Sequence, residues 1–123
     1  MESSGSTSIG SLAAGSRRYT LVPNTKCTWQ IETTKGYTVQ LIFDDMAIRR
    51  CSGCSCGYVR VRDGSGLSAQ SLGTFCNENY PRVVSSTGNH MFIEFYAQNS
   101  FDSFKATIRS IESEGIFYSK LKF

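Results

Sequence analysis

The 123-residue sequence predicts an all-β protein, an antiparallel β-sandwich of two sheets. Five segments alternate apolar and polar side chains with a period of two, and clusters of Gly, Asn, Ser and Asp separate them. No window of eleven residues between 17 and 110 carries an apolar stripe of helical period. Short strands joined by turn residues are typical of a sandwich.

Each alternating segment has one apolar side, which we expect to face the core. Turn residues follow the first and third of these segments, at 33–36 and 63–66, and precede the fourth, at 86–89. The apolar sides are, in chain order, Cys27, Trp29 and Ile31; Tyr37, Val39, Leu41 and Phe43; Val59 and Val61; Met91, Ile93 and Phe95; and Phe104, Ala106 and Ile108.

The length and these segments indicate one domain over residues 17–110. Residues 1–16 are rich in Ser and Gly and predict a flexible leader without the apolar stretch of a signal peptide. Residues 111–123 form either a tail or an extra element. No segment approaches the roughly 18 apolar residues of a membrane-spanning helix, so we expect no membrane insertion by this chain.

Five cysteines in a short chain indicate an oxidising compartment and disulfide bonds. The alternative is zinc, because Cys51, Cys54 and Cys56 are spaced like ligands. Only Cys76 and His90 could complete such a site, and neither has a close second ligand, so disulfides are favoured. A thiol-redox role also fits poorly, since that motif belongs at a helix start in a βαβ unit.

Charge and motifs exclude two further classes of function. The net charge is +3 and no run of four basic residues occurs, which argues against nucleic-acid binding. The single histidine, His90, has no evident carboxylate partner, and the Gly-x-Ser-x-Gly nucleophile motif is absent. We therefore expect neither catalysis nor a cofactor.

Several stretches in order along the chain resemble the CUB family of extracellular domains. They are CTWQI at 27–31 with GYTVQLIF at 36–43, CSCGYVRVRDG at 54–64, LGTFC at 72–76 with Pro81, SSTGNHMFIEF at 85–95, and SFKATI at 103–108. The resemblance implies a jelly-roll-like sandwich found in secreted proteins and ectodomains. It also implies a non-catalytic module that binds proteins or glycans.

The resemblance implies a pairing for some of the cysteines. Cys54 and Cys76 match the family's third and fourth cysteines, which are bonded to each other. Cys27 matches the second, but no cysteine precedes it to serve as the first. Either Cys51 and Cys56 pair with each other and leave Cys27 free, or one of them reaches Cys27.

Many family members bind calcium near one end of the sandwich through acidic residues. The matching positions in this chain are Arg49, Gly57 and Gln98, which cannot supply the carboxylates that Ca²⁺ needs. The less favoured alternative is a displaced site made from the nearby acidic residues, Asp44, Asp45 and Asp102. We therefore expect calcium-independent binding.

Arg49 takes one of these acidic positions, and further arginines lie close to it in the sequence. Arg49, Arg50, Arg60 and Arg62 predict a basic binding end that fits an acidic protein segment or a sulfated glycan. For Arg60 and Arg62 the favoured interpretation is the plainer one, that they form the solvent face of an amphipathic strand. The sequence thus indicates an extracellular, non-catalytic binding module, part of a larger protein. A spacer domain without a ligand is the main alternative, and a cysteine-based metal or redox site a distant one.

Overall fold

The computed structural model describes residues 6–14, 24–48, 51–76, 80–99 and 101–112. Within these ranges the chain forms eight strands and one 3-10 turn. In chain order they are β1 (Ser6–Ala14), β2 (Thr25–Glu32), β3 (Tyr37–Ala47), η1 (Ser52–Cys54), β4 (Gly57–Asp63), β5 (Gln70–Phe75), β6 (Val83–Ser85), β7 (His90–Ala97) and β8 (Ser103–Glu112). The described residues contain no helix that is long and apolar enough to cross a membrane.

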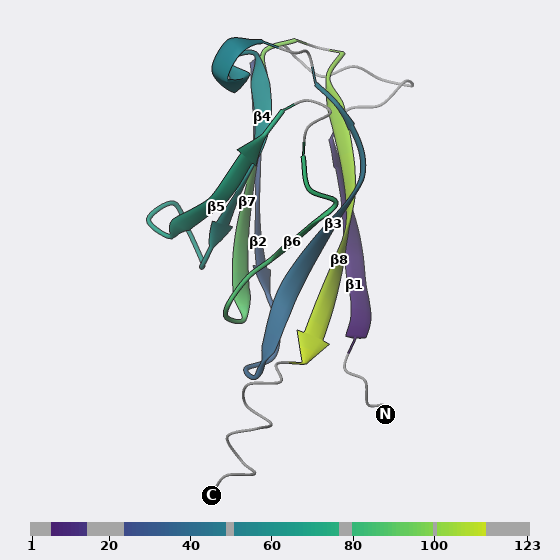
Figure 1. Ribbon diagram of the computed structural model, residues 1–123, viewed down its shortest axis with the longest axis vertical. Helices are drawn as coiled ribbons and strands as arrows, with labels where there is room; N and C mark the ends of the chain where they lie inside the picture. The colour runs from purple at the N-terminus through teal and green to yellow at the C-terminus, as the bar shows by residue number, and fades with distance from the viewer. Residues whose placement is uncertain (1–5, 15–23, 49–50, 77–79, 100, 113–123) are drawn as a thin grey trace, which may run out of the picture.

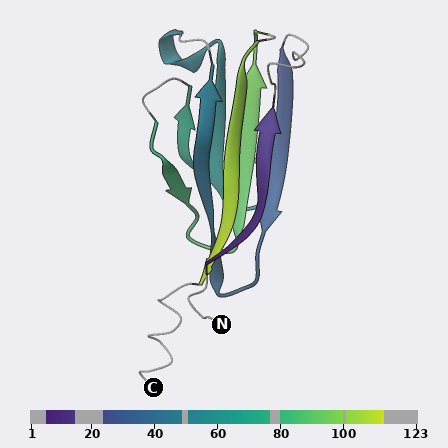
Figure 2. The same cartoon turned by 90° about the vertical axis from the view of Figure 1, so that its right-hand side faces the viewer.

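The strands form two four-stranded sheets, which confirms the predicted sandwich. One sheet has the order β1-β8-β3-β6 and the other β2-β7-β4-β5, and all pairings are antiparallel. The two sheets lie face to face in Figure 1, and the view in Figure 2 places the first sheet in front of the second. Each sheet therefore has one inner face toward the core and one outer face toward solvent.

The core lies between the two inner faces. The apolar sides predicted for β4, β7 and β8 are buried, as are Val39, Leu41 and Phe43 of β3. On β2, Cys27, Trp29 and Ile31 are half-buried and pack against this core. Phe104 of β8 contacts Phe95 and Trp29 of the opposite sheet, with ring centroids 5.2 Å and 5.5 Å apart. These aromatic contacts join the two sheets.

The prediction of a flexible leader over residues 1–16 is wrong for residues 6–14, which form a strand, and the rest of that range lies outside the described residues. Residues Ser6–Ala14 form β1 and pair antiparallel with β8, opposite Ile111 to Phe104. Leu12 and Ala14 are buried in the core, whereas Ser11 and Ala13 are exposed. The small and polar composition hides this alternation, because β1 contributes few large apolar side chains. At the other end, Ile111 and Glu112 belong to β8, and residues 113–123 lie outside the described part.

The two ends of the sandwich differ in how they are closed. The disulfide end comprises the end of β3, residues 51–57 and the β7–β8 connection at 98–102, since Gly57 pairs with Ala97 and Ala47 with Ser103. The loop end comprises the connections at 33–36, 64–69 and 86–89. There, Thr87 donates to the carboxylate of Asp63 from its backbone N and its Oγ1, over 2.9 Å and 2.7 Å.

Candidate functional site

The disulfide end is fixed by two disulfide bonds. Cys54 is bonded to Cys76, which follows β5, and Cys51 is bonded to Cys56 across a short loop. Cys27 is a free cysteine, half-buried on β2. The four bonded sulfur atoms are therefore not zinc ligands. Among the described residues, no three His, Cys, Asp or Glu side chains gather in a way that could hold a metal ion.

A tight turn brings these sulfur atoms together. Gly53 and Cys54 in η1 both have positive φ, 64° and 59°. This left-handed conformation is unfavourable for a residue with a Cβ, so the fold imposes it on Cys54. The Cys54 N–H donates to the Cys51 carbonyl over 3.2 Å. The Cys54–Cys76 bond ties η1 to the residue that follows β5.

Neither of the described residues that match the family's calcium positions, Gly57 and Gln98, carries a carboxylate. Gly57 is buried, and a Cβ added there would lie 2.8 Å from the Tyr96 carbonyl oxygen and 3.1 Å from Cγ2 of Ile48. No carboxylate fits in that space without displacing the backbone. The Gln98 N–H donates to the Cys56 carbonyl over 2.9 Å, and its side chain offers at most a neutral amide oxygen. Arg49 lies outside the described residues.

The three nearby acidic residues lie in different places. Asp44 and Asp45 are exposed near the end of β3, where Asp44 accepts a 2.7 Å hydrogen bond from Thr107. Asp102 is buried in the β7–β8 connection, and its N–H donates to the Asn99 carbonyl over 3.2 Å. These carboxylates form no shared cluster in the described part of the chain.

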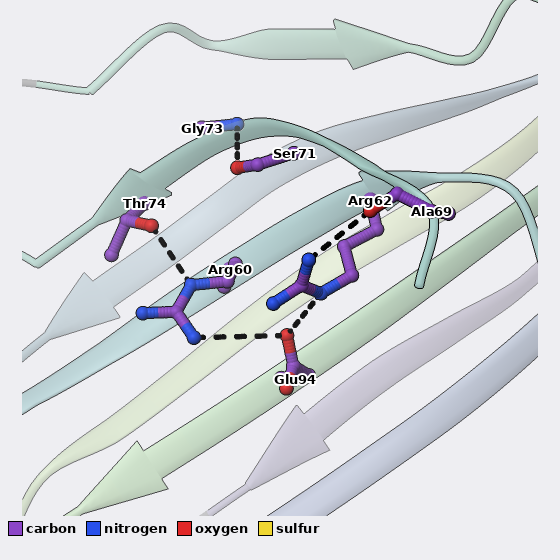
Figure 3. A network of polar contacts seen from close by, with 7 residues as sticks. All are labelled: Arg60, Arg62, Ala69, Ser71, Gly73, Thr74 and Glu94. Atoms are coloured by element: carbon purple, nitrogen blue, oxygen red, sulfur yellow. Dashed lines mark hydrogen bonds and ion pairs between the residues drawn. The ribbon is translucent and has the colours of Figure 1, made fainter. Parts of the chain in front are cut away.

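Arg60 and Arg62 project from the outer face of β4 and meet at Glu94 of β7 (Figure 3). The Nε of Arg62 donates to Glu94 over 2.9 Å, and its Nη1 donates to the Ala69 carbonyl over 3.1 Å. The Arg60 Nη1 lies 4.0 Å from Glu94, and its Nε donates to Oγ1 of Thr74 over 3.0 Å. Arg62 thus secures the β4–β5 connection at the loop end, away from the disulfide end. Arg49 and Arg50 lie outside the described residues.

Two tyrosines and a lysine extend this outer face toward the disulfide end. Tyr58 of β4 lies opposite Tyr96 of β7, which in turn lies opposite Lys26 of β2. The two rings are 5.6 Å apart, Lys26 Nζ is 6.0 Å from the Tyr96 centroid, and Arg60 Cζ is 4.5 Å from the Tyr58 centroid. We call Lys26, Tyr96, Tyr58 and Arg60 the cationic strip.

Sequence reasoning did not single out Lys26, Tyr58, Glu94 or Tyr96 as site residues. A signal existed, since all four fall on the polar side of alternating segments. What was missing was the strand order, because β2, β7 and β4 come from distant parts of the chain. Only the register of the pairings shows that Lys26, Tyr96 and Tyr58 share one row and that Glu94 lies on the same face in the next row.

One large apolar side chain is strongly exposed at the disulfide end. Phe101 has an exposed fraction of 76%, and its backbone N–H donates to Oδ1 of Asn99 over 3.0 Å. Leu67, exposed to 65%, occupies the loop end. Each lies in a connection between strands, where binding residues are common.

His90 has a carboxylate neighbour that the sequence did not reveal. Glu32 lies opposite it in the β2–β7 pairing, and the two side chains are 3.6 Å apart at the loop end. Both are well exposed. Such a pair in open solvent resembles an ordinary surface contact and contributes little to stability.

Comparison with known proteins decides the family. A sequence profile described as the CUB domain matches residues 5–107, which is most of the chain. The chain belongs to the CUB domain family. It is 34% identical over 90 residues to the inactive serine protease PAMR1 of Xenopus tropicalis, covering 72% of this chain and 12% of that protein. This CUB domain therefore spans only a small part of that curated relative.

Solved structures agree with the family and the fold. The CUB1-EGF-CUB2 domain of human MASP-1/3 is similar with a TM-score of 0.70 and 25% identity, over 84% of this chain and 41% of that one. The full extracellular region of zebrafish Gpr126/Adgrg6 is similar with a TM-score of 0.61 and 25% identity, over 84% of this chain and 14% of that one. CUB relatives thus occur in extracellular regions, and the CUB domain is itself a non-catalytic module.

Proposed function

We propose that this CUB domain is a non-catalytic extracellular module that binds a partner protein without calcium, as one part of a larger protein. The observation that carries the proposal is the exposed Phe101 at the disulfide end. Exposed aromatic side chains often serve as anchors in interfaces, because burying one contributes roughly 1.5–3 kcal/mol at little entropic cost.

The surroundings of Phe101 support this role. The Asn99 side chain accepts the Phe101 N–H, and the Asn99 carbonyl accepts the Asp102 N–H. These bonds reduce the freedom of the connection before a partner arrives, which lowers the cost of binding. Arg49 and Arg50, which directly precede Cys51 in the sequence, are candidates for contacts with acidic groups of that partner.

Calcium independence is supported by the way in which the disulfide end is closed. The space beside Gly57 is occupied by Ile48 and the backbone of Tyr96, and the Gln98 backbone is bonded to Cys56. Disulfides and strand pairing therefore hold this end together without a metal ion. A partner-binding surface here would need no calcium to become ordered.

An array of purified secreted proteins and ectodomains tests the proposal. Residues 1–123, fused to an antibody Fc fragment, would be applied in calcium and in EDTA. We expect binding to the same array proteins in both buffers, weakened by Phe101→Ser. Leu67→Ser is the matched control, since it removes another strongly exposed apolar side chain, from the opposite end.

Three results would count against the proposal. Binding that requires calcium would contradict the metal-independent site, and equal binding by the Phe101→Ser variant would exclude the disulfide end. The absence of any bound array protein would instead favour the spacer alternative.

A further inference from the structure

We infer that the cationic strip on the outer face of β2, β7 and β4 is a binding site for sulfated glycans. The inference goes beyond protein binding at Phe101 and rests on a different surface. The strip crosses three neighbouring strands, from Lys26 through Tyr96 and Tyr58 to Arg60. Because neighbouring strands are about 4.8 Å apart, it places two cationic groups on the order of 10 Å from each other.

The charge around the strip is positive. Among the residues that the structure describes, Lys26, Arg60 and Arg62 lie on this outer face with one nearby carboxylate, that of Glu94. When Glu32 at the loop end is counted as well, the described residues of this face carry three cationic and two anionic side chains. The outer face of the other sheet is balanced among its described residues, since Lys105 and Arg109 accompany two acidic residues, Asp44 and Asp45. An anionic ligand is therefore favoured on the first face.

Contacts within the domain orient the Arg60 guanidinium and leave some of its N–H donors for such a ligand. Its guanidinium lies over the Tyr58 ring, and its Nε donates to Thr74. Glu94 is closer to Arg62, at 2.9 Å, than to Arg60, at 4.0 Å. In the described part of the chain, the polar contacts of Arg60 run from Nε to Thr74 and from Nη1 to Glu94, so the N–H donors of Nη2 remain available. A guanidinium fork of this kind suits sulfate oxygens.

The rest of the face favours a sugar over an acidic peptide. The surface beside the strip carries hydroxyl and amide groups, those of Thr28, Gln30 and Thr74, on exposed positions. Hydroxyls and amides both donate and accept hydrogen bonds, as sugar hydroxyls require. The two tyrosines add polar edges and apolar faces to the same row.

Heparin chromatography with matched variants tests the inference. Lys26→Ala with Arg60→Gln removes the two cations of the strip, and Lys105→Ala with Arg109→Ala removes two cations from the opposite outer face. Both double variants have the same net charge. We expect the strip variant to elute at lower salt and to bind a heparin oligosaccharide about tenfold more weakly. The control variant should stay within twofold of the parent chain.

Thermal unfolding of each variant separates lost binding from lost folding, and only variants that melt within a few degrees of the parent are compared. Equal loss in both double variants would show unspecific attraction to net charge and overturn the inference. Undiminished binding of desulfated heparin, or tighter binding of polyglutamate than of heparin, would overturn it as well. None of these outcomes bears on the Phe101 array experiment, so the two proposals fail separately.

Discussion

Arg62 donates a 2.9 Å hydrogen bond to Glu94, and this bond runs diagonally from β4 to β7. Both side chains are largely buried, with exposed fractions of 19% and 14%. Arg62 also donates to the Ala69 carbonyl, so its guanidinium is bonded to two groups within the domain. Two arginines that look equivalent in the sequence therefore differ: Arg62 stabilises the sheet, whereas Arg60 keeps donors for a ligand.

Replacing Glu94 separates these two roles. Glu94→Gln removes the charged acceptor of Arg62, and we expect a loss of about 1 kcal/mol in the free energy of unfolding. The same change raises the positive charge beside Arg60, so retention on heparin should increase. Urea unfolding and salt elution measure the two effects. Glu32→Gln, at a 70% exposed position, makes the same change of charge away from the strip and should alter both much less. Unchanged retention of Glu94→Gln would contradict the sulfated-glycan site.

The two disulfides should stabilise the domain unequally. Cys54–Cys76 spans a sequence separation of 22 and Cys51–Cys56 one of 5. Loop-closure entropy predicts contributions of about 3 and about 2 kcal/mol, respectively. Paired Cys→Ala variants would be compared by urea unfolding under non-reducing conditions. Equal or reversed losses would mean that local packing, and not loop length, determines their contribution.

An acidic residue should not restore a calcium site at position 57. Gly57→Asp forces a Cβ against the Tyr96 carbonyl and Ile48, which we expect to cost about 1–3 kcal/mol. Gly57→Ala is the control, because it creates the same clash without a carboxylate. Calorimetry and melting curves in calcium up to about 10 mM, beyond the usual range of extracellular sites, would check this. A stoichiometric calcium response of Gly57→Asp, absent from Gly57→Ala, would refute our description of this end.

Much of the fold could be predicted because the large apolar side chains alternate. Val59, Ile93 and Ile108 all lie on the buried side that the pattern predicts. β1 was not predicted, because its alternation depends on small residues. Among its described side chains, Leu12 is the one that is both large and buried. Periodicity needs a contrast in polarity, and a Ser-, Gly- and Ala-rich edge strand provides little.

The candidate sites were harder to predict from the sequence. The strip depends on strand order and register, which bring Lys26 and Tyr58 to the same row from segments 32 positions apart. The sequence does not distinguish Phe101 from the other apolar residues, and only the fold shows that it lies exposed in the connection between β7 and β8. Local pattern tells which face a side chain occupies, but not which distant side chains share that face.

The free cysteine gives a direct chemical test of the cysteine pairing. With Cys51, Cys54, Cys56 and Cys76 in disulfides, only Cys27 keeps a thiol. We expect one thiol per chain by maleimide labelling and intact mass in denaturant. Labelling of the native protein should be slower, because Cys27 is half-buried on β2 and packs against the core. Cys27→Ser should abolish all labelling and keep both disulfides. Five labelled thiols, or a labelled Cys51 or Cys56, would contradict this pairing.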